Sequence, residues 1–109
     1  MRRFAAHFIW LGRQVYPMHY LELDDSGRFV GVHPLSEEIA HTSFFNGVLI
    51  PLPESLANEA DHWIRQWQQI PERLLKDEPL RLYNLENVNL PAAKLGTDNS
   101  GRYRYVQRF

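Results

Sequence analysis

Five histidines are the side chains in this 109-residue sequence best suited to hold a metal ion. Zinc sites are recognised as H-x-H pairs, as H-E-x-x-H, or as two histidines four residues apart on one helix. None of these spacings occurs, so the sequence predicts neither a metal site nor a metal cofactor. Some of the histidines could still come together in space, because His19 and His33 lie on strands that are expected to pair. The histidines are His7, His19, His33, His41 and His62.

Catalysis by carboxylates needs two acids whose surroundings push their pKa values apart. The adjacent acids here, Asp24-Asp25 and Glu37-Glu38, fall in predicted turns, where carboxylates are ordinarily solvated. The chain has no cysteine, no G-x-S-x-G turn and no glycine-rich phosphate loop, which removes common signatures of nucleophilic catalysis and nucleotide binding. We expect no catalytic and no cofactor-binding residue, and the pattern favours a non-enzymatic protein.

The C-terminal segment interleaves cations with aromatic rings, as platforms for single-stranded nucleic acid also do. On a strand, however, Arg102, Arg104 and Arg108 face one side while Tyr103 and Tyr105 face the other, which is typical of an edge strand with a charged outer face. With 12 basic and 13 acidic side chains the formal charge is −1, so no global field attracts nucleic acid. We expect neither nucleic acid nor membrane as a partner.

These side chains must be positioned mainly by strands. Residues 3–11 are largely apolar on both faces, which predicts a buried, interior strand, and residues 12–17 are expected to turn the chain. Strands over about 19–24 and 28–33 flank the Asp24–Gly27 turn and should form a hairpin. In that hairpin we expect Val30 and Val32 to face Leu21 and Leu23.

The stretch 44–53 combines an Asn46-Gly47 turn signal with an apolar run that two prolines close. It predicts a fourth strand over about 43–50. Further strands are expected over 81–85 and 102–109, separated by a loop-like segment rich in Asn, Gly and Pro.

After Pro53 the apolar period changes, which predicts an amphipathic helix over about 55–69 and a short helical turn over about 71–77. Ser55 or Asn58 is suited to cap the start. The apolar stripe is interpreted as the face that covers a sheet, with Trp67 near its margin; a partner-binding anchor of Trp63 and Trp67 is the alternative. The stripe comprises Leu56, Ala60, Trp63, Ile64, Trp67 and Ile70.

Together the elements predict a mainly β (α+β) single domain: a small sandwich-like sheet of about five to seven strands with one main helix. Its parts are a β-hairpin half (1–53), a helical insert (54–78) and closing strands (79–109). Residues 2–11 superficially resemble a signal sequence, but the apolar run is brief and no small-residue cleavage site follows. With no cysteine as well, we expect a cytoplasmic protein.

The order of signals in residues 4–53 resembles the composite β-domain that flanks the barrel in metal-dependent amidohydrolases, the urease, dihydroorotase and imidazolonepropionase group. The resemblance runs through the first strand, the hairpin with its acidic Gly turn, the polar segment from Pro34 to Glu38, and the Asn46–Pro51 run. In that family the proline leads into a catalytic barrel that opens with an H-x-H metal motif. Here Leu52-Pro53-Glu54-Ser55 leads into the predicted helix, so no metal-binding or catalytic residue of the family has a counterpart.

The resemblance implies a composite-type domain whose catalytic barrel is absent, with a structural or protein-interaction role. A surface that a barrel covers in the family would then drive self-association or bind a protein partner through apolar and aromatic side chains. An accessory domain or subunit that acts with a separate metal-dependent hydrolase is the alternative. A hydrolase in its own right is the least favoured interpretation.

Overall fold

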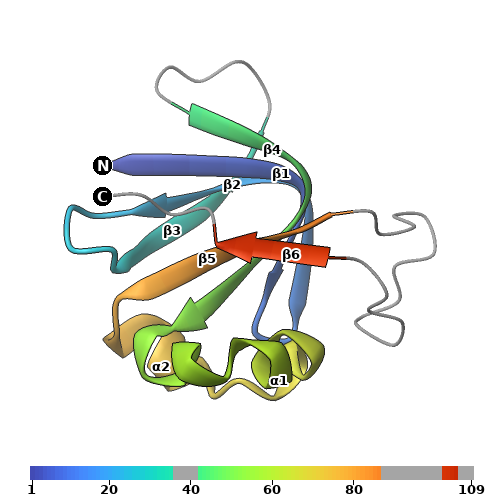
Figure 1. Cartoon of the computed structure of the whole chain (residues 1–109). Helices are drawn as coiled ribbons and strands as arrows, with labels where there is room; N and C mark the ends of the chain where they lie inside the picture. Colours follow the sequence, from blue (N-terminus) through green and yellow to red (C-terminus); the bar gives the residue numbers. More distant parts are fainter. Residues whose placement is uncertain (36–41, 87–101, 106–109) are drawn as a thin grey trace.

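The computed structural model describes residues 1–35, 42–86 and 102–105. Six strands form one mixed sheet in the order β3-β2-β1-β4-β5-β6, with the helices gathered at one end of it (Figure 1). The strands are β1 (Arg2–Leu11), β2 (Gln14–Leu23), β3 (Phe29–Pro34), β4 (Thr42–Pro53), β5 (Leu80–Glu86) and β6 (Arg102–Tyr105). The mainly β fold class predicted from the sequence is confirmed.

The first strand is interior, as predicted, because β1 pairs antiparallel with β2 on one side and parallel with β4 on the other. The turn that follows is shorter than expected. It consists of Gly12 and Arg13 alone, since Leu11 already pairs with Gln14. The prediction that residues up to Pro17 belong to the turn is wrong. Pro17 is tolerated inside β2 because β3 ends at the His19–Pro34 pair, so that no neighbour needs its missing N–H.

The β2–β3 hairpin forms around the predicted acidic turn. The Asp24 carboxylate accepts hydrogen bonds from the backbone N–H of Ser26 and of Arg28, both at 2.9 Å. Val32 faces Leu21 as expected, but Phe29 rather than Val30 is opposite Leu23, because the register shifts between Glu22 and Leu23. That irregularity leaves Val30 43% exposed, which corrects its predicted place in the core.

Asn46 and Gly47 form an irregularity inside β4 rather than a turn. The pairing passes from Ala6–Phe45 to Phe8–Val48, so two residues of β4 are opposite one residue of β1, which is a β-bulge. Strand β4 also runs through both prolines. Beyond Leu49 it pairs with β5 alone, where a missing N–H on the other side costs nothing.

The predicted helix over 55–69 is divided into three short pieces. They are a 3-10 helix η1 (Glu54–Glu59), α1 (Ala60–Arg65) and a 3-10 helix η2 (Trp67–Gln69); α2 (Glu72–Asp77) confirms the second helical turn. Ile64, Trp67 and Ile70 are all buried, and a spacing of three matches a 3-10 period rather than 3.6 residues. Neither η1 nor α1 has a side-chain cap, so Ser55 and Asn58 do not play the predicted role.

We call residues 54–77 the helical cap, because these pieces lie across one end of the sheet (Figure 1). Trp67 belongs to the core and not to its margin: it is 1% exposed and stacks on Trp10. Leu56 and Trp63, which we expected inside, are only partly buried and pack against the core from outside.

The sheet curls until distant strands meet. The backbone N–H of Leu80, at the start of β5, donates to the carbonyl of Gly27 in the β2–β3 turn at 2.8 Å, and Arg28 forms an isolated bridge with Pro79. Residues of β1, β2, β4, β5 and the helical cap fill the enclosed space as one apolar cluster. No helix within the described residues has the length and hydropathy needed to cross a membrane.

Candidate functional site

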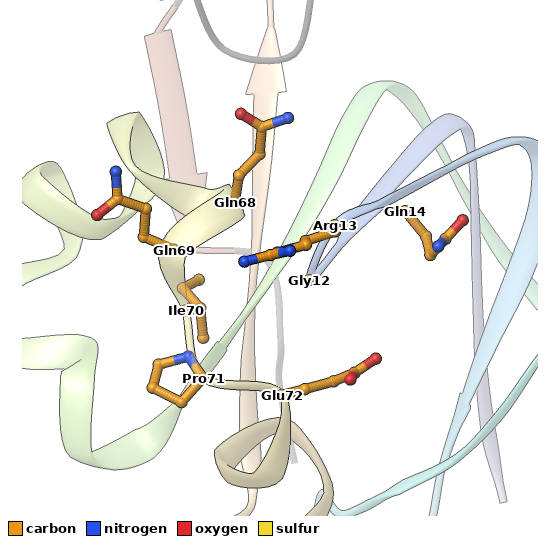
Figure 2. A pocket seen from close by; sticks show the side chains of 8 residues that line it. All are labelled: Gly12, Arg13, Gln14, Gln68, Gln69, Ile70, Pro71 and Glu72. Carbon is orange, nitrogen blue, oxygen red and sulfur yellow. The ribbon is translucent and has the colours of Figure 1, made fainter.

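A polar pocket lies where the β1–β2 turn meets the helical cap (Figure 2). Its volume is about 410 Å³, within the range of roughly 300–1,000 Å³ that small-molecule sites occupy. Its walls come from two segments more than fifty residues apart in the chain. The lining residues are Gly12, Arg13, Gln14, Gln68, Gln69, Ile70, Pro71 and Glu72.

The tight turn presents Arg13 to this pocket. Gly12 has φ +61° and takes the first central position of a two-residue turn, where type II′ geometry requires glycine. A Cβ built on Gly12 would lie 3.6 Å from Leu75 Cδ1 and 3.9 Å from Glu72 Cγ, so the turn rests directly on α2. From there the Arg13 side chain extends across the pocket toward the helical cap (Figure 2).

The opposite wall carries the negative charge. Glu72 is the first residue of α2, and its exposed side chain lines the same pocket as Arg13. In the part of the chain that the structure describes, neither Arg13 nor Glu72 forms an ion pair or side-chain hydrogen bond. The pocket therefore holds one cation and one anion whose hydrogen-bonding capacity is open to a ligand.

A second, smaller pocket of about 210 Å³ adjoins the first and shares Gln14 and Glu72 with it. It is more apolar. Its remaining lining residues are Leu11, Tyr16, Phe29, Leu75 and Lys76. We call these two neighbouring pockets together the turn–cap cleft, which has a charged part and an apolar part.

A separate polar cluster crosses β1, β2 and β3. Glu22, 15% exposed, accepts a hydrogen bond from Arg3 Nε at 3.1 Å and one from His33 Nε2 at 2.9 Å. The His33 ring also lies 5.1 Å from the ring of Tyr20. Because Arg3 and His33 on the neighbouring strands occupy both oxygens of the Glu22 carboxylate, we interpret this cluster as an ion-paired surface of the sheet.

The histidines that the sequence offered as metal ligands have separate partners. His7 Nε2 donates to Asn46 Oδ1 at 3.0 Å, and His19 Nδ1 donates to the Pro17 carbonyl at 2.8 Å. His62 lies against Trp63 on α1. Among the described residues no three His, Asp or Glu side chains gather as a metal site. His19 and His33 do lie on paired strands, as expected, whereas His41 lies outside the described residues.

Of the other residues considered for chemistry, Asp24 organises the hairpin turn, and Asp25 lies 3.9 Å from the N-terminal ammonium. Glu37-Glu38 and Arg108 fall outside the described residues. Arg102–Tyr105 form β6, as predicted for a strand there, with their backbone pairing to β5.

Searches of protein families, of curated proteins and of solved structures found no match to this chain. These comparisons therefore neither support nor oppose the resemblance to the amidohydrolase composite domain.

Sequence reasoning missed the turn–cap cleft. Its two walls are far apart in the chain, and the segment 68–72 was assigned partly to a continuous helix. The one available signal was Gly12-Arg13, because a glycine-arginine turn between two strands presents its cation at the tip.

Proposed function

We propose that this chain is a non-catalytic domain of the amidohydrolase composite type that serves assembly. The strand arrangement supports the proposal: β4 leaves the sheet at Pro53, and β5 returns beside it, with Leu80 paired to Pro53. The helical cap occupies the interval between these two residues, where the resembled family would insert its barrel. A cytoplasmic location belongs to the same proposal, in keeping with a chain that contains no cysteine.

The interaction surface is not at the barrel position, because the helical cap buries its own apolar stripe there. Ile64, Trp67, Ile70 and Leu75 are each at most 5% exposed. Within the described residues, the large apolar side chains that remain exposed lie elsewhere, at the N-terminus and on β2, β3 and β4. They are Met1, Met18, Val30 and Phe44.

Phe44, at 49% exposed, is the centre of the surface we favour. The pairing of Phe44 with Ala5, and of Ala5 with Tyr20, places these residues on one face of the sheet. Arg3, Glu22 and His33 share that face through their own pairings, and His7 meets Phe44 edge to face at 5.4 Å. We call this set of residues the Phe44 face.

A second copy of the chain is the partner that this face fits. The face carries a half-exposed aromatic anchor, Phe44, beside the ion pair of Arg3 and Glu22. A two-fold axis brings the same patch of both copies together, so that the two Phe44 rings can pack on each other while the ion pair of each copy stays intact beside them. Aromatic anchors surrounded by polar groups are typical of protein interfaces.

The test is gel filtration of the variant Phe44→Ser beside Val30→Thr. Both replace a similarly exposed apolar residue on a strand, but Val30 lies in the β2–β3 irregularity. We expect Phe44→Ser to shift the protein to the monomer position, and Val30→Thr to elute like the unaltered chain. Circular dichroism of both variants checks that the fold is retained. Equal elution of all three proteins would overturn the role of the Phe44 face.

The alternative, an accessory subunit of a separate metal-dependent hydrolase, predicts a chain that stays monomeric by itself and binds that enzyme when the two purified proteins are mixed.

Catalysis by this chain is tested independently by elemental analysis. Zinc or nickel at one equivalent per chain would contradict the non-catalytic assignment.

A further inference from the structure

The turn–cap cleft combines two features that no part of the proposed assembly role uses. Its polar part contains opposite charges on facing walls, Arg13 on the β1–β2 turn and Glu72 on α2 (Figure 2). Its smaller part is walled by Leu11, Tyr16, Phe29 and Leu75. Glu72 and Gln14 line both parts, which places the two parts side by side.

The charges restrict what the polar part can hold. An arginine guanidinium recognises a carboxylate through paired N–H donors. A simple anion would pair with Arg13 but would place its negative charge near that of Glu72. A simple cation would pair with Glu72 but would place its positive charge near that of Arg13. A ligand that carries a carboxylate and an ammonium on the same carbon atom can satisfy both walls at once. Gln68, Gln69 and Gln14 add amide donors and acceptors around it.

The apolar part selects the remainder of the ligand. Two aromatic and two leucine side chains offer it an apolar surface, and its volume of about 210 Å³ is suited to one side chain rather than to a whole drug-sized molecule. Lys76 lies at the same wall, and its ammonium disfavours a cationic side chain there. An uncharged, bulky group fits this part best.

We infer that the turn–cap cleft binds a free α-amino acid with a large apolar side chain. Its carboxylate pairs with Arg13, its ammonium pairs with Glu72, and its side chain enters the apolar part between Tyr16, Phe29 and Leu75. The inference stands apart from the assembly proposal, because the cleft and the Phe44 face share no residue.

The experiment is an NMR titration of the full chain with L-phenylalanine and with two derivatives that each lack one charge. N-Acetyl-L-phenylalanine lacks the ammonium, and L-phenylalaninamide lacks the carboxylate. We expect L-phenylalanine to shift the amide signals of Gly12, Arg13 and Leu75. Each derivative should bind about tenfold more weakly or worse, which corresponds to about 1.4 kcal/mol for the loss of one charge-assisted contact.

Two variants assign the charges to their walls. Arg13→Gln should weaken L-phenylalanine about tenfold and leave the affinity of the amide unchanged. Glu72→Gln should do the same for L-phenylalanine and leave the acetylated derivative unchanged. Arg73→Gln and Glu59→Gln remove exposed charges of the helical cap that line neither pocket, and they should have no effect.

Absence of any signal shift up to the solubility limit of L-phenylalanine would overturn the inference. So would shifts that are the same for all three compounds, since those would report only an apolar surface. The NMR titration tests the cleft, and gel filtration tests the Phe44 face. Failure of the amino-acid proposal is therefore distinguishable from failure of the assembly proposal.

Discussion

Trp10 of β1 and Trp67 of η2 stack with their ring centroids 5.1 Å apart and their planes inclined by 21°. Both side chains are at most 2% exposed. The pair joins the first strand of the sheet to the helical cap. Trp10 lies two residues before Gly12, and Trp67 directly precedes Gln68, so the contact ties together the two segments that line the turn–cap cleft.

Replacing Trp67 with alanine should lower the free energy of unfolding by about 3–5 kcal/mol, the cost of deleting a buried aromatic side chain. Trp63→Ala is the matched control. It removes the same side chain from the same cap, but Trp63 is only partly buried, and we expect a loss nearer about 1 kcal/mol. Urea denaturation followed by circular dichroism measures both. Equal losses would contradict the assignment of Trp67 as the residue that fixes the cap.

Gly47→Ala should destabilise the protein by about 2–3 kcal/mol. Gly47 has φ +156°, and a Cβ there would lie 2.5 Å from the backbone oxygen of Leu85 and 2.8 Å from Asn84 Oδ1. Backbone and a buried side chain leave the methyl group no space. Thermal unfolding checks the loss as a lowered Tm.

Gly31→Ala is the control for that variant, since Gly31 also lies in a strand of the sheet. Its added Cβ would approach only the ring of His33, with Nε2 nearest at 3.0 Å, and this exposed ring can move aside. We expect a change within about 1 kcal/mol. If alanine at position 47 is tolerated as well as alanine at 31, the bulge in β4 is not as described.

Glu78→Ala should reduce stability by about 1 kcal/mol. The Glu78 carboxylate accepts hydrogen bonds from the backbone N–H and from the hydroxyl of Ser55, both at 2.9 Å. It thereby links the start of the helical cap to the residue just after its end. Glu59→Ala removes an exposed acid of the cap without such contacts, and it should stay within about 0.5 kcal/mol of the unaltered protein. Denaturant titration of the two variants separates these outcomes.

The strands and the β2–β3 hairpin could be predicted because their signals are local: alternating side chains and an Asp-Gly turn act over a few residues. The bulge in β4 and the register shift between β2 and β3 could not be predicted, because they depend on pairing between different strands. The bulge at Asn46-Gly47 is a property of the pairing between β1 and β4, and the sequence of either strand alone does not reveal it. The same holds for Val30, which is displaced by a register shift that depends on β2.

The helical cap shows how packing decides between two helical periods. The stripe of apolar residues was correctly assigned to the sheet side, but Trp67 and Trp63 were ranked in the wrong order. A continuous α-helix turns Ile64, Trp67 and Ile70 progressively away from one line, whereas the structure breaks the helix after Arg65, forms a 3-10 turn over residues 67–69, and buries all three side chains. The turn–cap cleft follows from that geometry and could not be predicted from spacing.

Light scattering on the unaltered protein over a broad concentration series measures its self-association. We expect a mass that rises to twice that of one chain and then stays constant, because a two-fold pairing of the Phe44 face closes on itself. A mass equal to one chain at the highest concentration would contradict it.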